Sequence, residues 1–175
     1  MKLIQTIHSY DVFMFNWFMN RKHFELCVRV SRWVSRTGDG FLYPVVAVCL
    51  YYVDAPLGRL FFVCALCAFL VERPLYFVLK NGFKRGRPEQ ALPDFHSFII
   101  PSDRFSFPSG HTSAAFLMAS LLGYFFPPLI LPLYTWASAV GLSRIFLGVH
   151  FPTDVLVGST MGTTIALISL RMFAA

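Results

Sequence analysis

Charged residues are scarce in this sequence: they fill 14% of its 175 positions, whereas soluble domains carry about 25%. Cysteine is also sparse, with four residues, and the pair with CxxC spacing, Cys64 and Cys67, lies in an apolar run without a second pair or a nearby histidine. We therefore expect neither a disulfide framework nor a zinc site, and packing between helices accounts better for these thiols. No other set of side chains has the spacing of a metal site, so we expect no metal and no other cofactor.

Hydrophobic residues make up 56% of the chain, and most of them fall in long apolar blocks. A transmembrane helix needs about 20 mostly apolar residues, so we place spans near 40–55, 57–80, 109–126, 128–148 and 152–171. The predicted fold is all-α, a polytopic membrane helix bundle of about five transmembrane helices. By length, residues 1–175 form a single domain, with the bundle in residues 40–171.

The net charge of +6 does not indicate a nucleic-acid partner. No basic face with interleaved aromatic residues lies outside the apolar blocks, as nucleic-acid binding would require. Anionic lipid headgroups and phosphate chemistry account better for the basic excess. We expect the partners to be membrane lipids and a lipid phosphate.

Residues 1–36 differ in pattern from the rest of the chain. The apolar run 12–19 is too short to cross a membrane. From residue 21 to residue 36, cations recur at positions 22, 29, 32 and 36, with Leu26, Val30, Trp33 and Val34 on the other side. This pattern predicts interfacial amphipathic helices, and packing of the same segment against the bundle is compatible with that prediction.

Lys80 and Arg87 belong to the first of three polar motifs between the apolar blocks. Their seven-residue spacing is two helical turns, so a helix that ends near Pro88 would set both cations on one face. Arginine offers forked donors to phosphate oxygens, and lysine adds a mobile point charge. The neighbouring Lys84 and Arg85 either assist these cations or form a pair that faces solvent or lipid headgroups.

The second motif is Pro108-Ser109-Gly110-His111, which has the form of a helix entry with Ser109 as the cap. The amides of Gly110 and His111 would then point outward at the positive end of a helix. Such a helix start binds anions, and glycine lets a phosphate approach the backbone closely. His111 could donate a proton to a leaving oxygen from this position.

The third motif runs from Ser143-Arg144 to His150 and Asp154. Pro152 suits the first turn of a helix, which places His150 just before that helix and Asp154 in its first turn. Asp154 can then accept a hydrogen bond from one ring nitrogen of His150 and leave the other nitrogen free to attack. Arg144 closes the preceding span on the same side as His150.

In order, the motifs read Lys-x6-Arg-Pro, Pro-Ser-Gly-His and Ser-Arg-x5-His-x3-Asp, and together they resemble the signature of the type 2 phosphatidic acid phosphatase superfamily. The resemblance implies a helical membrane enzyme that removes phosphate from lipid phosphates or diphosphates without a metal ion. It implies that His150 is the nucleophile that becomes phosphorylated, that Asp154 orients it, and that His111 protonates the leaving oxygen and later helps to activate water. The implied phosphoryl cradle is Lys80, Arg87, Ser109, Gly110 and Arg144.

Several alternatives stay open. Vanadium-dependent haloperoxidases carry the same signature but are soluble, and a non-enzymatic lipid-binding protein would need a degraded site. Transfer of phosphate from one lipid to another acceptor would keep the fold and change the reaction. Undecaprenyl diphosphate, phosphatidylglycerophosphate, phosphatidic acid and a lipid A phosphate would all present a similar group to these residues.

Two features near the motifs allow further expectations. Glu72 and Arg73 lie inside an apolar block and should face the bundle, where Glu72 could pair with Arg73 or Lys80. The loop 89–105 has four apolar side chains that either dip into the headgroup region or pack as an ordinary loop: Phe95, Phe98, Ile99 and Ile100. We interpret His96 as a loop residue without a catalytic role.

The topology departs from the family pattern, because membrane members usually have six spans and the first is missing here or reduced to 12–19. Five spans would put the basic segment 21–36 and all three motifs on one membrane face, with the C-terminus opposite. The excess of Lys and Arg on that face indicates the cytoplasm by the positive-inside rule. The resemblance implies the periplasmic side instead, and we favour the periplasmic face of a bacterial inner membrane.

Overall fold

The computed structural model describes residues 2–174, which form helices joined by turns and loops, with no strand among them. This confirms the predicted all-α class. Residues 1 and 175, the ends of the predicted single domain, lie outside the described range. The elements are α1 (Lys2–Met19), α2 (Phe24–Thr37), α3 (Leu42–Val53), α4 (Ala55–Phe83), α5 (Pro88–Ala91), α6 (Gly110–Phe125), the 3-10 turn η1 (Pro127–Leu129), α7 (Ile130–Phe146) and α8 (Pro152–Phe173).

Helices occupy all five predicted span positions, but they differ in length. Among residues 2–174, three helical segments are long and apolar enough to cross a membrane: Ala55–Ala91, Pro127–Phe146 and Pro152–Phe173. Helix α3 has 12 residues and α6 has 16, which at 1.5 Å per residue is less than the roughly 30 Å of a hydrocarbon core. Helix α3 stops early because Asp54 caps the next helix, its Oδ1 accepting the Leu57 amide at 3.1 Å.

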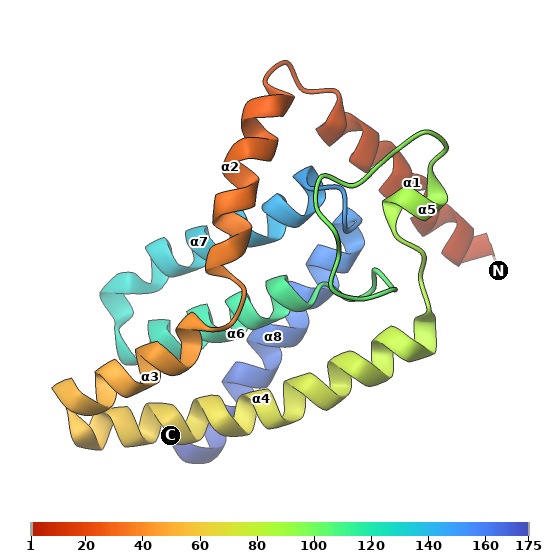
Figure 1. Ribbon diagram of the computed structural model, residues 1–175. Helices are drawn as coiled ribbons and strands as arrows, with labels where there is room; N and C mark the ends of the chain where they lie inside the picture. The colour runs from red at the N-terminus through yellow and green to blue at the C-terminus, as the bar shows by residue number, and fades with distance from the viewer. Residues whose placement is uncertain (1, 175) are drawn as a thin grey trace.

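Helix α6 is the centre of the bundle and packs against α4, α7 and α8 (Figure 1). Its apolar side chains Leu117, Met118 and Leu121 are buried in the main core with residues of α4 and α8. The approach to α8 is so close that a Cβ atom on Gly162 would lie 2.0 Å from the Ser113 carbonyl oxygen. Small residues at such crossings let two backbones meet, and here they fix the start of α6 against α8.

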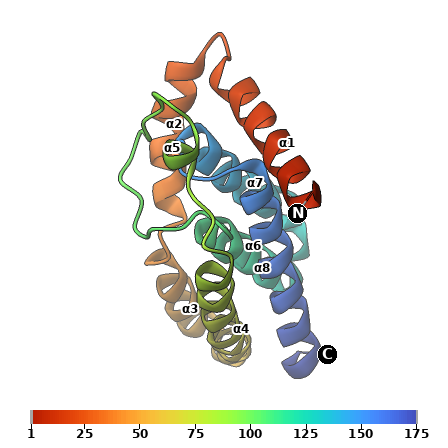
Figure 2. The ribbon, with the colours of Figure 1, turned by 90° about the vertical axis from the view of Figure 1, so that its right-hand side faces the viewer.

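The N-terminal helices α1 and α2 lie at the end of the bundle opposite the C-terminus (Figure 2). Helix α2 packs on α7 through its buried residues Val28, Ser31 and Ser35. Leu26, Val30 and Trp33, on the predicted apolar side, stay exposed, with Trp33 at 68%. The predicted apolar side of this helix therefore faces mostly away from the bundle, where an interfacial helix would meet lipid.

The loop between α5 and α6 folds back over the N-terminal helices. The ring of Phe95 lies edge-on to Phe15 at 5.1 Å, and the ring of Phe98 lies edge-on to Phe24 at 5.3 Å. Ordinary loop packing therefore describes Phe95 and Phe98, whereas Ile100 is 96% exposed. The contacts also place the predicted interfacial segment and this loop at the same end of the bundle.

Candidate active site

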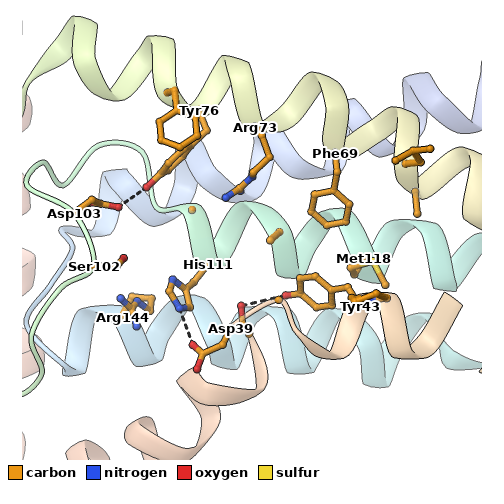
Figure 3. A pocket seen from close by; sticks show the side chains of 18 of the residues that line it. Asp39, Tyr43, Phe69, Arg73, Tyr76, Ser102, Asp103, His111, Met118 and Arg144 are labelled. Carbon is orange, nitrogen blue, oxygen red and sulfur yellow. Dashed lines mark hydrogen bonds and ion pairs between the residues drawn. The ribbon is translucent and has the colours of Figure 1, made fainter. Parts of the chain in front are cut away.

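All three sequence motifs meet at one end of the helix bundle. Four helix segments carry them toward the right-hand side of Figure 1: the C-terminal half of α4, the start of α6, the end of α7 and the start of α8. A cavity of about 610 Å³ opens there, and predicted site residues line its polar end: Arg87, Gly110, His111, Arg144 and His150. Its other end runs between α3 and α4 over apolar side chains that include Tyr43, Phe69 and Met118 (Figure 3).

His150 and Asp154 lie side by side, as their spacing predicts, but the predicted hydrogen bond between them is not formed. His150 lies between α7 and α8 and is 2% exposed, and Asp154 lies in the first turn of α8. Asp154 Oδ2 accepts the Phe151 amide at 2.8 Å and lies 3.6 Å from His150 Nδ1. Within residues 2–174, Nδ1 is a buried atom without a hydrogen-bond partner. Asp154 is therefore placed to orient the ring, with Nε2 as the nitrogen on its far side.

Burial keeps His150 uncharged. Desolvation lowers the pKa of its imidazole to about 4, the charges of Arg144 and Arg87 act in the same direction, and Asp154 opposes them. A neutral imidazole has a lone pair on one nitrogen, which is the form that a nucleophile needs.

Lys80 and Arg87 come together as predicted, but not for the predicted reason. Helix α4 ends at Phe83, Lys84 adopts a left-handed conformation with φ of 48°, and Arg87 is extended, so no continuous helix reaches Pro88. What joins the two cations is a carboxylate: Asp103 Oδ1 lies 2.6 Å from Lys80 Nζ and 2.5 Å from Arg87 Nη2.

Asp103 was not expected in the cradle. Its Oδ2 also accepts from Tyr76 Oη at 2.6 Å. Burial alone would raise the pKa of Asp103, but hydrogen bonds from Lys80 and Tyr76, with the charges of Lys80 and Arg87, lower it to about 2. The carboxylate is therefore ionised, and its Oδ1 accepts from both cations as a phosphate oxygen would.

Arg144 lines the polar end of the cavity. Its guanidinium is buried at the end of α7, where Nη1 donates to Ser35 Oγ of α2 at 2.5 Å. Its Nε is a buried atom that lacks a hydrogen-bond partner among the described residues. A buried, unsatisfied cationic donor on the wall of a cavity is suited to an anionic ligand.

Ser109, Gly110 and His111 begin α6 as predicted, with Ser109 at the cap position. The Ser109 hydroxyl pairs with Thr112 Oγ1 at 2.8 Å rather than with a backbone amide, and Ser109 is fully buried. A Cβ on Gly110 would lie 2.8 Å from the Tyr76 ring, so the absence of a side chain also makes room for Tyr76. His111 Nε2 is 2.9 Å from Asp39 Oδ1.

Arg85 does not face solvent or headgroups, so that alternative is wrong for this residue. Its Nη1 donates to Asp154 Oδ1 at 2.8 Å and to Thr153 Oγ1 at 2.7 Å, and its Nη2 donates to Asp11 Oδ2 of α1 at 2.5 Å. The N-terminal helix is thus connected through one guanidinium to the carboxylate beside His150. Lys84 is exposed, as the same alternative predicts.

Glu72 pairs with Arg73 rather than with Lys80. Glu72 is fully buried and accepts from Arg73 Nη2 at 2.6 Å and from Ser113 Oγ at 2.6 Å. Arg73 also lines the cavity, between the polar and the apolar end (Figure 3). His96 is a loop residue, as interpreted from the sequence, with its side chain 88% exposed.

Comparison with known proteins shows where this architecture recurs. A sequence model of the PAP2 superfamily matches residues 56–175. The decaprenylphosphoryl-5-phosphoribose phosphatase of Mycobacterium tuberculosis is 30% identical over 142 residues, which cover 79% of this chain and 76% of that protein.

Two solved structures share the fold. LpxE of Aquifex aeolicus matches with a TM-score of 0.78 at 28% identity, over 91% of this chain and 94% of that one. The transmembrane PAP2-type phosphatidylglycerolphosphate phosphatase of Bacillus subtilis matches with a TM-score of 0.72 at 26% identity, over 95% of this chain and 86% of that one.

Proposed function

The chain belongs to the PAP2 superfamily, as an integral membrane enzyme of its lipid phosphatase group, and we propose that it hydrolyses a lipid phosphate or diphosphate through a phosphohistidine at His150. One observation carries the proposal: a single cavity joins His150, His111 and three arginines to an apolar channel between α3 and α4. A phosphoryl group fits the charged end, and the first part of a lipid tail fits the apolar end.

In the first step, the lone pair of His150 Nε2 attacks the phosphorus atom. The bond from phosphorus to the leaving lipid oxygen breaks, and that oxygen takes a proton from His111. Asp154, 3.6 Å from Nδ1 of His150, would approach this nitrogen to accept its hydrogen bond and stabilise the positive charge that the ring acquires. Phosphoryl transfer depends mainly on positioning and charge stabilisation, which Lys80, Arg87 and Arg144 would provide, together with the amide groups at the start of α6.

In the second step, His111, now neutral, takes a proton from a water molecule as its oxygen attacks the phosphorus. The phosphorus–nitrogen bond breaks, its electron pair returns to His150, and inorganic phosphate leaves. Asp103 Oδ1 lies within ion-pair distance of both Lys80 and Arg87. Substrate phosphate would have to displace or share this carboxylate, because both present oxygens to the same donors.

The named activities of the relatives support a lipid or lipid-linked phosphate as the substrate class, and they differ in the lipid. We propose undecaprenyl diphosphate, phosphatidylglycerophosphate or phosphatidic acid as the substrate type. Lipid A phosphate and transfer to a second lipid are the alternatives. Phosphate release from each lipid in detergent, with and without a second lipid as acceptor, separates these cases.

The central test is replacement of His150. His150→Ala should abolish phosphate release and leave folding nearly intact, and labelled substrate should leave acid-labile phosphate on the wild-type chain only. His96→Ala is the matched control, because its side chain is 88% exposed in a loop. Release near the wild-type rate by His150→Ala, or phosphate trapped on a serine, would remove the assignment.

We also propose that the enzyme works without a metal ion and lies in a bacterial inner membrane with its site on the periplasmic face. Buried arginine and lysine side chains supply the charge that a metal would otherwise provide. Phosphate release should therefore continue in EDTA, and restoration by Mg²⁺ of an activity lost in EDTA would contradict this. Vanadate should inhibit by bonding to His150, whereas vanadate-dependent peroxidase activity would favour the haloperoxidase alternative.

A further inference from the structure

Asp39 lies in the turn between α2 and α3 and contacts the second histidine of the site. Its Oδ1 is 2.9 Å from His111 Nε2, across 72 positions of sequence. In Figure 3 the other ring nitrogen of His111 is turned away from Asp39, toward the cavity. None of the three sequence motifs includes this carboxylate.

The turn that carries Asp39 is held in place by the bundle. Trp136 Nε1 of α7 donates to Thr37 Oγ1 at 2.8 Å, and Tyr43 Oη of α3 donates to the Gly38 carbonyl at 3.4 Å. A Cβ on Gly38 would lie 2.9 Å from a methyl group of Val140, so this turn also packs directly on α7. The carboxylate is thus presented to His111 by anchored backbone and not by a free loop end.

We propose that Asp39 is the positioning residue of the general acid: it holds His111 with Nε2 protonated, so that Nδ1 delivers the proton to the leaving lipid oxygen. The inference rests on the proposed role of His111. When Nδ1 gives up its proton the ring becomes neutral, and the Nε2–H bond to Asp39 persists. The ring therefore keeps the orientation in which Nδ1 can later take a proton from water.

Other charged groups around His111 do not replace Asp39. Burial lowers the pKa of His111 to about 4, and the charge of Arg144 from α7 acts in the same direction. Asp39 and, from the preceding loop, Asp103 raise this pKa, as the negative charge of a bound phosphate would. Asp103 is already bound to Lys80, Arg87 and Tyr76. Arg32 and Arg36 of α2 line a neighbouring cavity that His111 and Asp39 also border, and they would repel an imidazolium. Asp39 is thus the carboxylate that bonds to the ring.

The test compares two leaving groups on the same preparation. Dodecyl phosphate has a poor leaving group that needs a proton, whereas p-nitrophenyl phosphate leaves without one. Asp39→Asn should lower kcat for dodecyl phosphate by about 10- to 100-fold, within the range of general acid catalysis, and lower it for p-nitrophenyl phosphate by less than about threefold. The ratio of the two rates does not depend on how much of the variant is folded.

Three further variants complete the design. Asp39→Glu should restore part of the ratio, and Asp94→Asn, which removes an exposed carboxylate from the loop at the same end, should leave both rates unchanged. His111→Ala should show the same leaving-group dependence, and Asp39→Asn should add nothing to it if Asp39 acts through His111.

Equal losses on both substrates, or additive losses with His111→Ala, would overturn the role of Asp39 and leave the phosphatase proposal standing. A His111→Ala variant without leaving-group dependence would instead overturn the general acid itself, and with it this inference.

Discussion

Replacement of Arg85 tests the connection between the N-terminal helix and the catalytic carboxylate. Its guanidinium bridges Asp11 and Asp154, whose side chains are 1% and 0% exposed, and is itself 20% exposed. Arg85→Gln leaves two buried carboxylates without their cation. Breaking a buried ion pair costs about 3–5 kcal/mol, and the partial exposure of Arg85 favours the lower end, about 3 kcal/mol. For a chain of this length that corresponds to a fall in Tm of roughly 6–12 °C.

The double variant makes this prediction specific. Asp11→Asn alone should destabilise less, because Arg85 keeps its bond to Asp154 at 2.8 Å. In the Arg85→Gln background, Asp11→Asn should recover part of the loss, since it removes one of the two unpaired charges. The destabilisation of the double variant should fall short of the sum of the single variants by at least about 1 kcal/mol.

Thermal unfolding in detergent, followed by helical circular dichroism, measures these shifts. Phosphate release by the same samples should fall more for Arg85→Gln than for Asp11→Asn, because Arg85 bonds directly to Asp154. Lys84→Gln is the matched control, as it removes the adjacent, exposed cation. An unchanged Tm for Arg85→Gln, or strict additivity with Asp11→Asn, would refute the proposed link.

Other predictions follow from the same geometry. Arg144→Ala should lower kcat by on the order of 10²–10³ if its guanidinium stabilises transition-state charge, and steady-state kinetics with Ser143→Ala as the comparison would show it. Burial lowers the pKa of His150 to about 4, so the nucleophile is neutral above that pH. The acid limb of the pH profile of kcat/KM should therefore lie near pH 4. An acid limb near pH 6.5 that depends on His150 would contradict this. Single cysteines at positions 22 and 94, in a background without the native thiols, should label from the same, periplasmic side. Labelling from opposite sides would mean that residues 10–30 cross the membrane.

Much of the site could be predicted because its relations are local. His150, Pro152 and Asp154 are fixed by the geometry of one helix start, and Ser109 to His111 by another. The apolar blocks predicted an all-α membrane bundle, because a helix satisfies its own backbone hydrogen bonds in lipid. The helix starts depend on residues within about one helical turn of each other, and the bundle depends on the composition of the apolar blocks. The sequence shows local spacing and block composition directly.

The partners of the site residues depended on tertiary structure. Asp39 meets His111 only because α2 packs on α7, and Asp103 reaches Lys80 only because the loop after α5 folds inward. The expected helix through Arg87 was wrong, since the chain leaves α4 at Lys84 and a distant carboxylate brings the cations together. Asp11 and Arg85 are 74 positions apart, and no local pattern encodes their contact. Sequence spacing determines which side chains share a helix turn, whereas packing between helices decides which buried charges meet.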